Sequence, residues 1–168
     1  ATRHSARTFT DKPISDQTLS NLLWAAWGVT RPDGKRTAPS ALNKQEIDVY
    51  VARADGLFRY DAQAHALEKA LGEDIRALTG RQDFVAVAPV NLIYVGDRSK
   101  LQGAPEEDKT FYMAANTGYI SQNVYLFCAS EGLATVVRGW VDRDALAKKM
   151  QLKPNQTITL APTVGYAK

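Results

Sequence analysis

The longest stretch without a charged residue runs from Thr110 to Ser130, and it restricts the fold more than any other part of the sequence. A stretch of this length could cross a bilayer as a helix. Amides and hydroxyls inside it argue against a lipid environment, where they would lack partners: Asn116, Thr117, Ser121, Gln122 and Asn123. We therefore predict no membrane span but a long helix from about Glu107 to Glu131, apolar all round and buried on most sides. A dimer core is one natural place for such a helix.

The first half of the chain contains the signals of a helix, a hairpin, a second helix and a strand. Ser15 or Asp16 can cap a helix that Gly28 ends, since apolar residues recur between them at helical spacing. Residues 46–61 alternate in polarity around the Asp55-Gly56 turn, which predicts a β-hairpin. Leucine and isoleucine at helical spacing predict a helix over residues 64–78, and the apolar run at 90–97 predicts a central strand.

The second half predicts a strand over 134–141, a short helix over 142–150 capped by Asp142, and one last strand over 157–166. With the elements above, the order is α-β-β-α-β-α-β-α-β. This order predicts an α+β fold with a mixed central sheet flanked by helices. No repeat, linker or low-complexity tract divides the chain, so residues 1–168 are expected to form a single domain.

Charge is distributed unevenly along the chain. Residues 1–44 contain seven Lys or Arg and three Asp or Glu, and the remaining residues contain fourteen and fifteen, within a total of 21 and 18. A nucleic-acid binder usually spreads basic residues along a longer face, so nucleic acid is not an expected partner. The chain starts at Ala1 with motif residues close behind, which we interpret as the removal of an upstream segment. For this soluble domain, the sequence is consistent both with a cytoplasmic location and with export.

The residue inventory excludes much side-chain chemistry. His4 and His65 are the only histidines and Cys128 is the only cysteine, so neither a His/Cys metal-ligand set nor a disulfide within the chain can form. No glycine-rich phosphate loop follows a strand. If the protein is an enzyme, a bound cofactor is expected to carry the chemistry. The opening "RHSAR", residues 3–7, suits a phosphate because guanidinium groups donate paired hydrogen bonds to its oxygens, although a solvated basic terminus would look the same.

Four separated segments resemble the FMN-dependent nitroreductase family. They are "RHSARTF" at 3–9, "APSALNKQE" at 38–46, "NTGYISQNVYLFCASEGLATVVRG" at 116–139 and "TVGYAK" at 163–168. The sequences of the second segment and of "GLFRYD" most resemble those of the SagB/ThcOx-like branch of this family. The resemblance implies a homodimer with two FMN sites at the subunit interface, and such a homodimer would explain a helix that is apolar all round.

The resemblance also implies a set of FMN-binding residues. Arg3, Ser5 and Lys168 would hold the phosphate, with His4 beside them, and Arg7 would approach the pyrimidine edge or the ribityl chain. A loop that wraps the flavin, partly donated by the partner subunit, would contain Pro39, Ser40, Ala41 and Asn43, with Gln45 as support. The backbone of Val137, Arg138 and Gly139 would approach flavin N5, and Gln82 would send a polar side chain toward the ring. The alternative for Arg138 is a surface charge at a strand end.

The function implied by the resemblance is that of an oxidoreductase. A reductant, expected to be NAD(P)H, would pass hydride to flavin N5, and a small acceptor such as a nitro-compound or quinone would then take the electrons. Relatives of the SagB type instead run the flavin in the oxidising direction on azoline heterocycles. Two further alternatives are a non-catalytic flavin-binding protein and a basic anion- or nucleic-acid-binding module.

Overall fold

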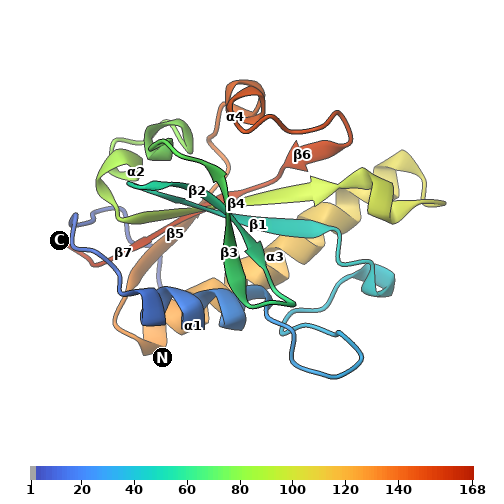
Figure 1. Cartoon of the computed structure of the whole chain (residues 1–168), viewed down its shortest axis with the longest axis horizontal. Coiled ribbons are helices and arrows are strands. Elements are labelled where there is room, and N and C mark those ends of the chain that lie inside the picture. The colour runs from blue at the N-terminus through green and yellow to red at the C-terminus, as the bar shows by residue number, and fades with distance from the viewer. Residues whose placement is uncertain (1–2) are drawn as a thin grey trace.

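A computed structural model of the chain, which describes residues 3–168, contains seven strands and four α-helices within that range (Figure 1). The helices are α1 (Asp16–Trp27), α2 (Phe84–Val87), α3 (Glu106–Ser130) and α4 (Arg143–Lys149). The strands are β1 (Ile47–Arg53), β2 (Gly56–Asp61), β3 (Ala66–Leu71), β4 (Val90–Asp97), β5 (Ala134–Arg138), β6 (Gln156–Ile158) and β7 (Ala161–Gly165). Short 3-10 turns lie at Ala41–Asn43, Arg76–Leu78 and Arg98–Leu101.

All seven strands belong to one sheet with the order β3-β2-β1-β4-β7-β5, and β6 pairs with the remaining length of β4. The strand pairings of the described chain are antiparallel throughout, so the prediction of a mixed sheet was wrong in this detail. The crossover through α3 does join two strands of the same direction, β4 and β5. They are not neighbours, because β7 inserts between them and runs antiparallel to both.

Helix α1 begins and ends where the sequence predicts. The side chain of Ser15 accepts a hydrogen bond from the backbone N–H of Thr18 at 3.1 Å, and the N–H of Gly28 bonds the carbonyl of Trp24. Such capping satisfies backbone groups that a helix end would otherwise leave without partners. The apolar side chains that set the helical period are all buried: Leu19, Leu22, Leu23, Ala26 and Trp27.

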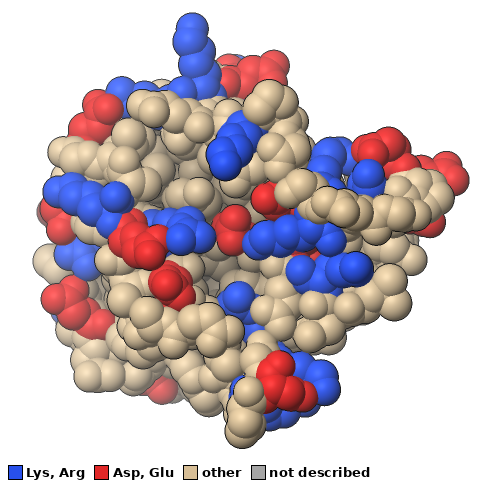
Figure 2. Space-filling model, turned by 45° about the vertical axis from the view of Figure 1, so that its right-hand side comes forward, with Lys and Arg blue, Asp and Glu red and all other residues tan. Residues whose placement is uncertain are grey.

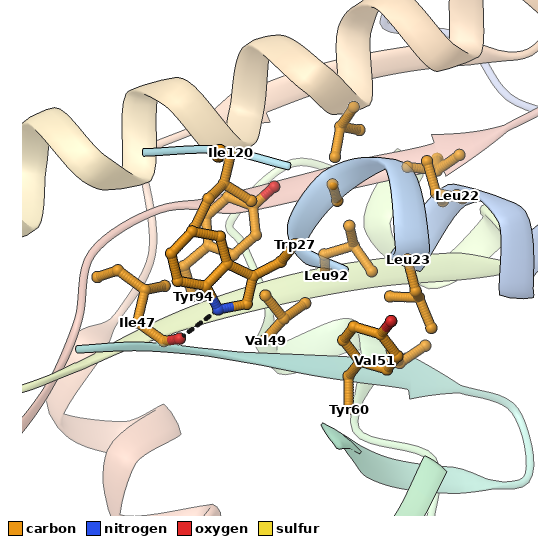
Figure 3. Close-up of a cluster of buried hydrophobic side chains, with 14 of the residues drawn as sticks. Leu22, Leu23, Trp27, Ile47, Val49, Val51, Tyr60, Leu92, Tyr94 and Ile120 are labelled. Atoms are coloured by element: carbon orange, nitrogen blue, oxygen red, sulfur yellow. Dashed lines mark hydrogen bonds between the residues drawn. The ribbon is translucent and has the colours of Figure 1, made fainter. Parts of the chain in front are cut away.

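The sheet has helices on both faces. In Figure 1, α1 and α3 lie on one side of the strands and α4 on the other. The larger core cluster joins α1 and α3 to β1 and β4, and its centre is shown in Figure 3. There the indole of Trp27 donates a hydrogen bond to the carbonyl of Ile47 at 2.9 Å. On the opposite face, Leu146 of α4 packs with Ile93 and Val95 of β4, so β4 is buried on both faces as predicted.

Helix α3 confirms the long predicted helix, but its polarity is unusual. The face toward its own sheet includes Asn116, Thr117 and Ser121, each of which is buried and hydrogen bonded. The large apolar residues Phe111, Tyr119 and Leu126 are 67%, 51% and 48% exposed. In one copy of the chain, α3 is therefore buried on one side only. None of the helices described for residues 3–168 combines the length and the apolar character needed to cross a membrane.

Two segments differ from the sequence predictions. Residues 64–78 do not form a helix: they contain β3, then a bend, then the 3-10 turn at Arg76–Leu78. Strand β3 pairs with β2 and places Glu68 opposite Arg59, with the charged atoms 2.6 Å apart. The final strand is also divided. Residues between β6 and β7 leave the strand conformation, so β6 and β7 pair with different parts of β4.

Candidate functional site

The N-terminal segment lies beside β5 and the end of the chain. The backbone N–H of Ala6 donates to the carbonyl of Thr135 at 3.0 Å, which joins the segment to one edge of β5. Phe9 and Ala167 form an antiparallel bridge, and the N–H of Thr10 donates to the carbonyl of Tyr166. Residues from the first and last motifs are thereby brought together at one end of the sheet.

This end of the sheet has several exposed cations. Arg3, Arg7 and Lys168 are exposed. The isolated bridge of Phe9 with Ala167 brings Lys168, the next residue, close to the N-terminal segment. Within residues 3–168, no carboxylate pairs with Arg3, Arg7 or Lys168. Their charges are consequently available for an anion, and guanidinium groups are well suited to phosphate.

Tyr125 of α3 connects the N-terminal segment to β5. Its hydroxyl lies 2.7 Å from the hydroxyl of Ser5 and accepts a hydrogen bond from the N–H of Val137 at 3.1 Å. The guanidinium of Arg3 lies over its ring, 5.0 Å from the centroid. Sequence reasoning missed Tyr125, because a tyrosine within an uncharged helix gives no sign of which segments it will touch.

His4 lines a cavity of about 180 Å³ behind this segment, together with Cys128, Thr135 and Ala167. The cavity lies between the C-terminal end of α3 and the start of β5. Burial raises the pKa of the Cys128 thiol to about 12, so this side chain is a neutral part of the cavity wall at ordinary pH.

Arg138 is not the surface charge that the alternative interpretation expected. Its side chain is 4% exposed and donates to Thr163 Oγ1 at 2.9 Å, to the carbonyl of Thr79 at 2.7 Å and to Asn91 Oδ1 at 3.2 Å. Burial lowers its pKa to about 10, so it remains a cation at neutral pH, with neutral acceptors as its partners. Only the backbone of Arg138 is left to serve a ligand at this edge.

Gln82 lies next to this buried guanidinium. A Cβ atom at Gly80 would overlap Nη1 of Arg138 and would lie 2.8 Å from Oε1 of Gln82. The Oε1 atom is buried and has no hydrogen-bond partner among the described residues. The structure thus brings Gln82 close to the end of β5, with its carbonyl oxygen turned toward the protein interior.

Val137 and Gly139 differ in what they offer a ligand. The N–H of Val137 is already bonded to Tyr125, whereas Gly139 is exposed. A Cβ atom on Gly139 would meet nothing closer than Leu160 Cδ2 at 3.5 Å, and the backbone there is not left-handed. Neither the packing nor the backbone conformation of this chain requires a glycine at 139. Close approach of an external group would explain it.

The loop at Pro39, Ser40, Ala41 and Asn43 is tied together by Gln45, as expected. Gln45 donates its backbone N–H to Ser40 Oγ and its side-chain Nε2 to Asn43 Oδ1, both at 3.0 Å. The Nδ2 of Asn43 makes no hydrogen bond within residues 3–168 and is available to a ligand. Figure 1 shows this loop at the opposite end of the molecule from β5, β7 and the C-terminus. One copy of the chain does not bring the two groups of motif residues together.

The surface near this loop shows no extended area of one charge. In Figure 2, basic and acidic side chains are intermixed over the face that is turned forward. A surface of this kind differs from the continuous basic stripe that a nucleic-acid backbone favours.

The candidate site lies at one end of a sheet with helices on both faces, where the exposed cations of the first and last motifs come together. The chain belongs to the Nitroreductase family, whose sequence model matches residues 1–166. A presumed nitroreductase from Methanocaldococcus jannaschii is 31% identical over 147 residues, which cover 82% of this chain and 74% of that protein. The solved structure of a presumed nitroreductase from Ralstonia eutropha JMP134 is 44% identical, with a TM-score of 0.94, over 99% of this chain and 80% of that one. The comparisons confirm the expected family and its oxidoreductase class.

Two structures of lower identity show the same fold. The microcin synthetase McbBCD complex of E. coli contains a chain with a TM-score of 0.87 and 21% identity, matched over 100% of this chain and 70% of that one. A nitroreductase-family structure from Desulfovibrio desulfuricans in complex with FMN has a TM-score of 0.70 and 24% identity, over 98% of this chain and 81% of that one. Both agree with this chain in fold, and the second is a neighbour of this fold bound to FMN.

Proposed function

We propose that this chain is an FMN-dependent oxidoreductase that works as a homodimer. The observation that carries the proposal is the separation of the two motif groups. The N-terminal segment that contains Arg3 and Ser5 is hydrogen bonded to β5, and the 39–43 loop lies at the opposite end of the molecule from β5 and the C-terminus (Figure 1). Two copies related by a twofold axis could place the loop of one beside the anion-binding end of the other, which would complete two sites.

The exposed face of α3 supports association of two copies. Phe111, Tyr119 and Leu126 are separated by eight and seven residues, which places them on one side of a helix. Trp24 of the neighbouring α1 is also exposed. A large apolar surface of this kind is typical of an interface between subunits.

The residues present fit the flavin phosphate in charge and in donor type. Arg3 and Lys168 would neutralise the phosphate, Ser5 would donate a hydroxyl to it, and His4 lines the adjoining cavity. Arg7 would hold a positive charge near the polar edge of the ring, where a fixed cation favours the anionic reduced cofactor. Bound FMN would supply hydride acceptance and donation at N5. Gly139 is exposed just after β5, and its N–H would orient the ring there.

The reductant and acceptor follow from the family rather than from a pocket in this chain. NAD(P)H is the proposed reductant, and a nitro-compound or quinone is the proposed acceptor. The alternative is oxidation of a heterocycle, which the fold likeness to the microcin synthetase chain supports at the level of fold alone. In either case the tasks of the protein are to bind the cofactor, to orient it and to exclude water.

The proposal is tested by flavin binding and then by turnover. Purified protein should titrate FMN with quenching of the flavin fluorescence, and the flavin-loaded protein should consume NADH or NADPH with a nitroaromatic or quinone acceptor. The double variant Arg3→Ala, Arg7→Ala should weaken FMN binding by about two orders of magnitude, because two charge-assisted contacts are lost.

The matched control removes two exposed lysines elsewhere on the surface, Lys148→Ala with Lys153→Ala, and should leave FMN affinity unchanged. Protein that binds no FMN would refute the proposal. Protein that binds FMN but passes no electrons from NAD(P)H to either acceptor would favour the heterocycle oxidase or a non-catalytic flavin protein.

A further inference from the structure

Tyr125 contacts three groups that are far from it in sequence and belong to different segments. Its hydroxyl bridges Ser5 Oγ, at 2.7 Å, and the N–H of Val137, at 3.1 Å, and its ring lies beneath the guanidinium of Arg3, with Cζ 5.0 Å from the centroid. Two of these partners are the residues proposed to hold the cofactor phosphate. The third belongs to β5, the strand that leads to the proposed ring-binding segment.

The backbone N–H of Val137 determines one half of this relay. A backbone N–H can only donate, so the hydroxyl of Tyr125 accepts from Val137. Tyr125 keeps its own hydrogen, and Ser5 Oγ lies 2.7 Å from its hydroxyl oxygen, where either oxygen of the pair can be the donor. With Tyr125 donating to its oxygen, Ser5 has its own hydrogen left to donate. The side of Ser5 that a ligand meets is then a hydroxyl donor, which is what a phosphate oxygen needs.

The ring of Tyr125 acts on Arg3 separately. A guanidinium over an aromatic face is held there by the charge distribution of the ring, and this orients a long side chain that makes no ion pair within residues 3–168. One side chain therefore orders both the cation and the hydroxyl donor, before any anion binds.

We propose that Tyr125 is a positioning residue that makes the site selective for the phosphorylated flavin, FMN, over riboflavin. The proposal rests on the proposed function, and it assigns to Tyr125 no contact with the cofactor itself. Its hydroxyl orients Ser5 as a donor and its ring orients Arg3, so both effects fall on the phosphate and neither falls on the ring system.

The experiment compares the affinities of FMN and riboflavin in the wild type and in Tyr125→Phe, measured by quenching of flavin fluorescence. The variant keeps a ring beneath Arg3 and removes the hydroxyl. FMN affinity should fall by about tenfold, equal to about 1.4 kcal/mol, while riboflavin affinity stays within about twofold of the wild type. Tyr60→Phe removes a tyrosine hydroxyl that lies 2.8 Å from His65 Nδ1, on a strand far from β5 in the sheet; it is the matched control and should change neither affinity.

A double-mutant cycle with Ser5→Ala tests the relay itself. Once Ser5 is alanine, Tyr125→Phe should have little further effect on FMN affinity, because both changes remove the same oriented donor. A second readout needs no flavin: amide hydrogen exchange at Val137 in the cofactor-free protein should become faster in Tyr125→Phe, since its hydrogen-bond acceptor is gone.

The outcomes separate this inference from the proposed function. Equal loss of FMN and riboflavin affinity would mean that Tyr125 only supports the fold, and unchanged FMN affinity would mean that the relay does not matter; both refute the inference and leave the proposed function standing. A wild-type protein that binds neither flavin overturns both. A wild-type protein that binds both flavins with equal affinity refutes phosphate selectivity alone.

Discussion

The buried guanidinium of Arg138 and the glycine beside it allow a stability prediction that can be worked out from the structure. A Cβ atom at position 80 would overlap Nη1 of Arg138, the nitrogen that donates to the carbonyl of Thr79 at 2.7 Å. The backbone of Gly80 is not left-handed, so conformational strain is not part of the cost. Gly80→Ala must therefore act by displacing the guanidinium.

The expected magnitude follows from the bonds that are lost. Displacement breaks a charged hydrogen bond, worth about 1.5–3 kcal/mol, and leaves the buried Thr79 carbonyl without a partner. We expect Gly80→Ala to lower the free energy of unfolding by about 2–4 kcal/mol. Arg138→Met should cost a similar amount, since it removes three hydrogen bonds but also removes a buried charge.

The double variant provides the decisive comparison. If both substitutions act through the same guanidinium, their combined cost should stay close to the larger single cost, with a coupling of about 1–3 kcal/mol. Urea unfolding at one fixed protein concentration measures all three variants, so that the proposed association would contribute equally to each measured stability. Gly72→Ala, where a Cβ would come no closer than 3.6 Å to another atom, is the control and should change stability by less than about 0.5 kcal/mol. Additive costs, or a harmless Gly80→Ala, would refute the reasoning.

Two further predictions concern the thiol and the exposed glycine. Burial raises the pKa of Cys128 from 9.0 to about 12, so native protein at pH 8 should react with a thiol reagent at least about a hundredfold more slowly than protein unfolded in guanidinium. Because the unfolded thiol loses its proton first, Cys128 should also lower stability progressively as the pH rises above about 9, which urea unfolding at pH 8 and 10 would detect; equal thiol reactivity in both states would contradict this account. Gly139→Ala should leave urea unfolding of the cofactor-free protein nearly unchanged but weaken FMN binding on the order of tenfold or more, since the new methyl group would occupy space that the proposed function assigns to the flavin ring. Unchanged FMN affinity would mean that nothing approaches this backbone closely.

Local signals account for the elements that the sequence predicted correctly. Ser15 and Gly28 bound α1 because a cap and a stop act on neighbouring backbone groups, and the Asp55-Gly56 turn joins β1 to β2 for the same reason. The apolar run of β4 reflects burial on both faces. None of these inferences required knowledge of which distant segments meet.

The failures occurred where distant pairing decides the outcome. Leu67 and Leu71 have the spacing of a helix, and their neighbours are good helix formers, yet pairing with β2 holds them in a strand. Gly72 within the run was a signal against a helix. The antiparallel sheet depended on the insertion of β7 between β4 and β5, which no local pattern records.

In the candidate site, too, the sequence indicated some residues correctly but not the contacts that depend on distant segments. The resemblance selected Arg3, Ser5 and Lys168, and the structure brings these residues to one end of the sheet. It could not indicate that the side chain of Arg138 points inward, because successive side chains of a strand face opposite ways and the register decides which way. Tyr125 was missed because its role comes from three contacts that are distant in sequence.

The composition of β3 also has a consequence for solubility. This strand is at the free end of the sheet, where unpaired backbone groups would invite another chain to add on and start an aggregate. Its exposed residues include Glu68 and Lys69, and its sequence favours a strand only weakly. A foreign strand that docked there would have to bury these charges. The charged residues of β3, which favoured the incorrect helix prediction, thus protect this edge strand from the addition of further strands. The N-terminal segment covers part of the opposite edge.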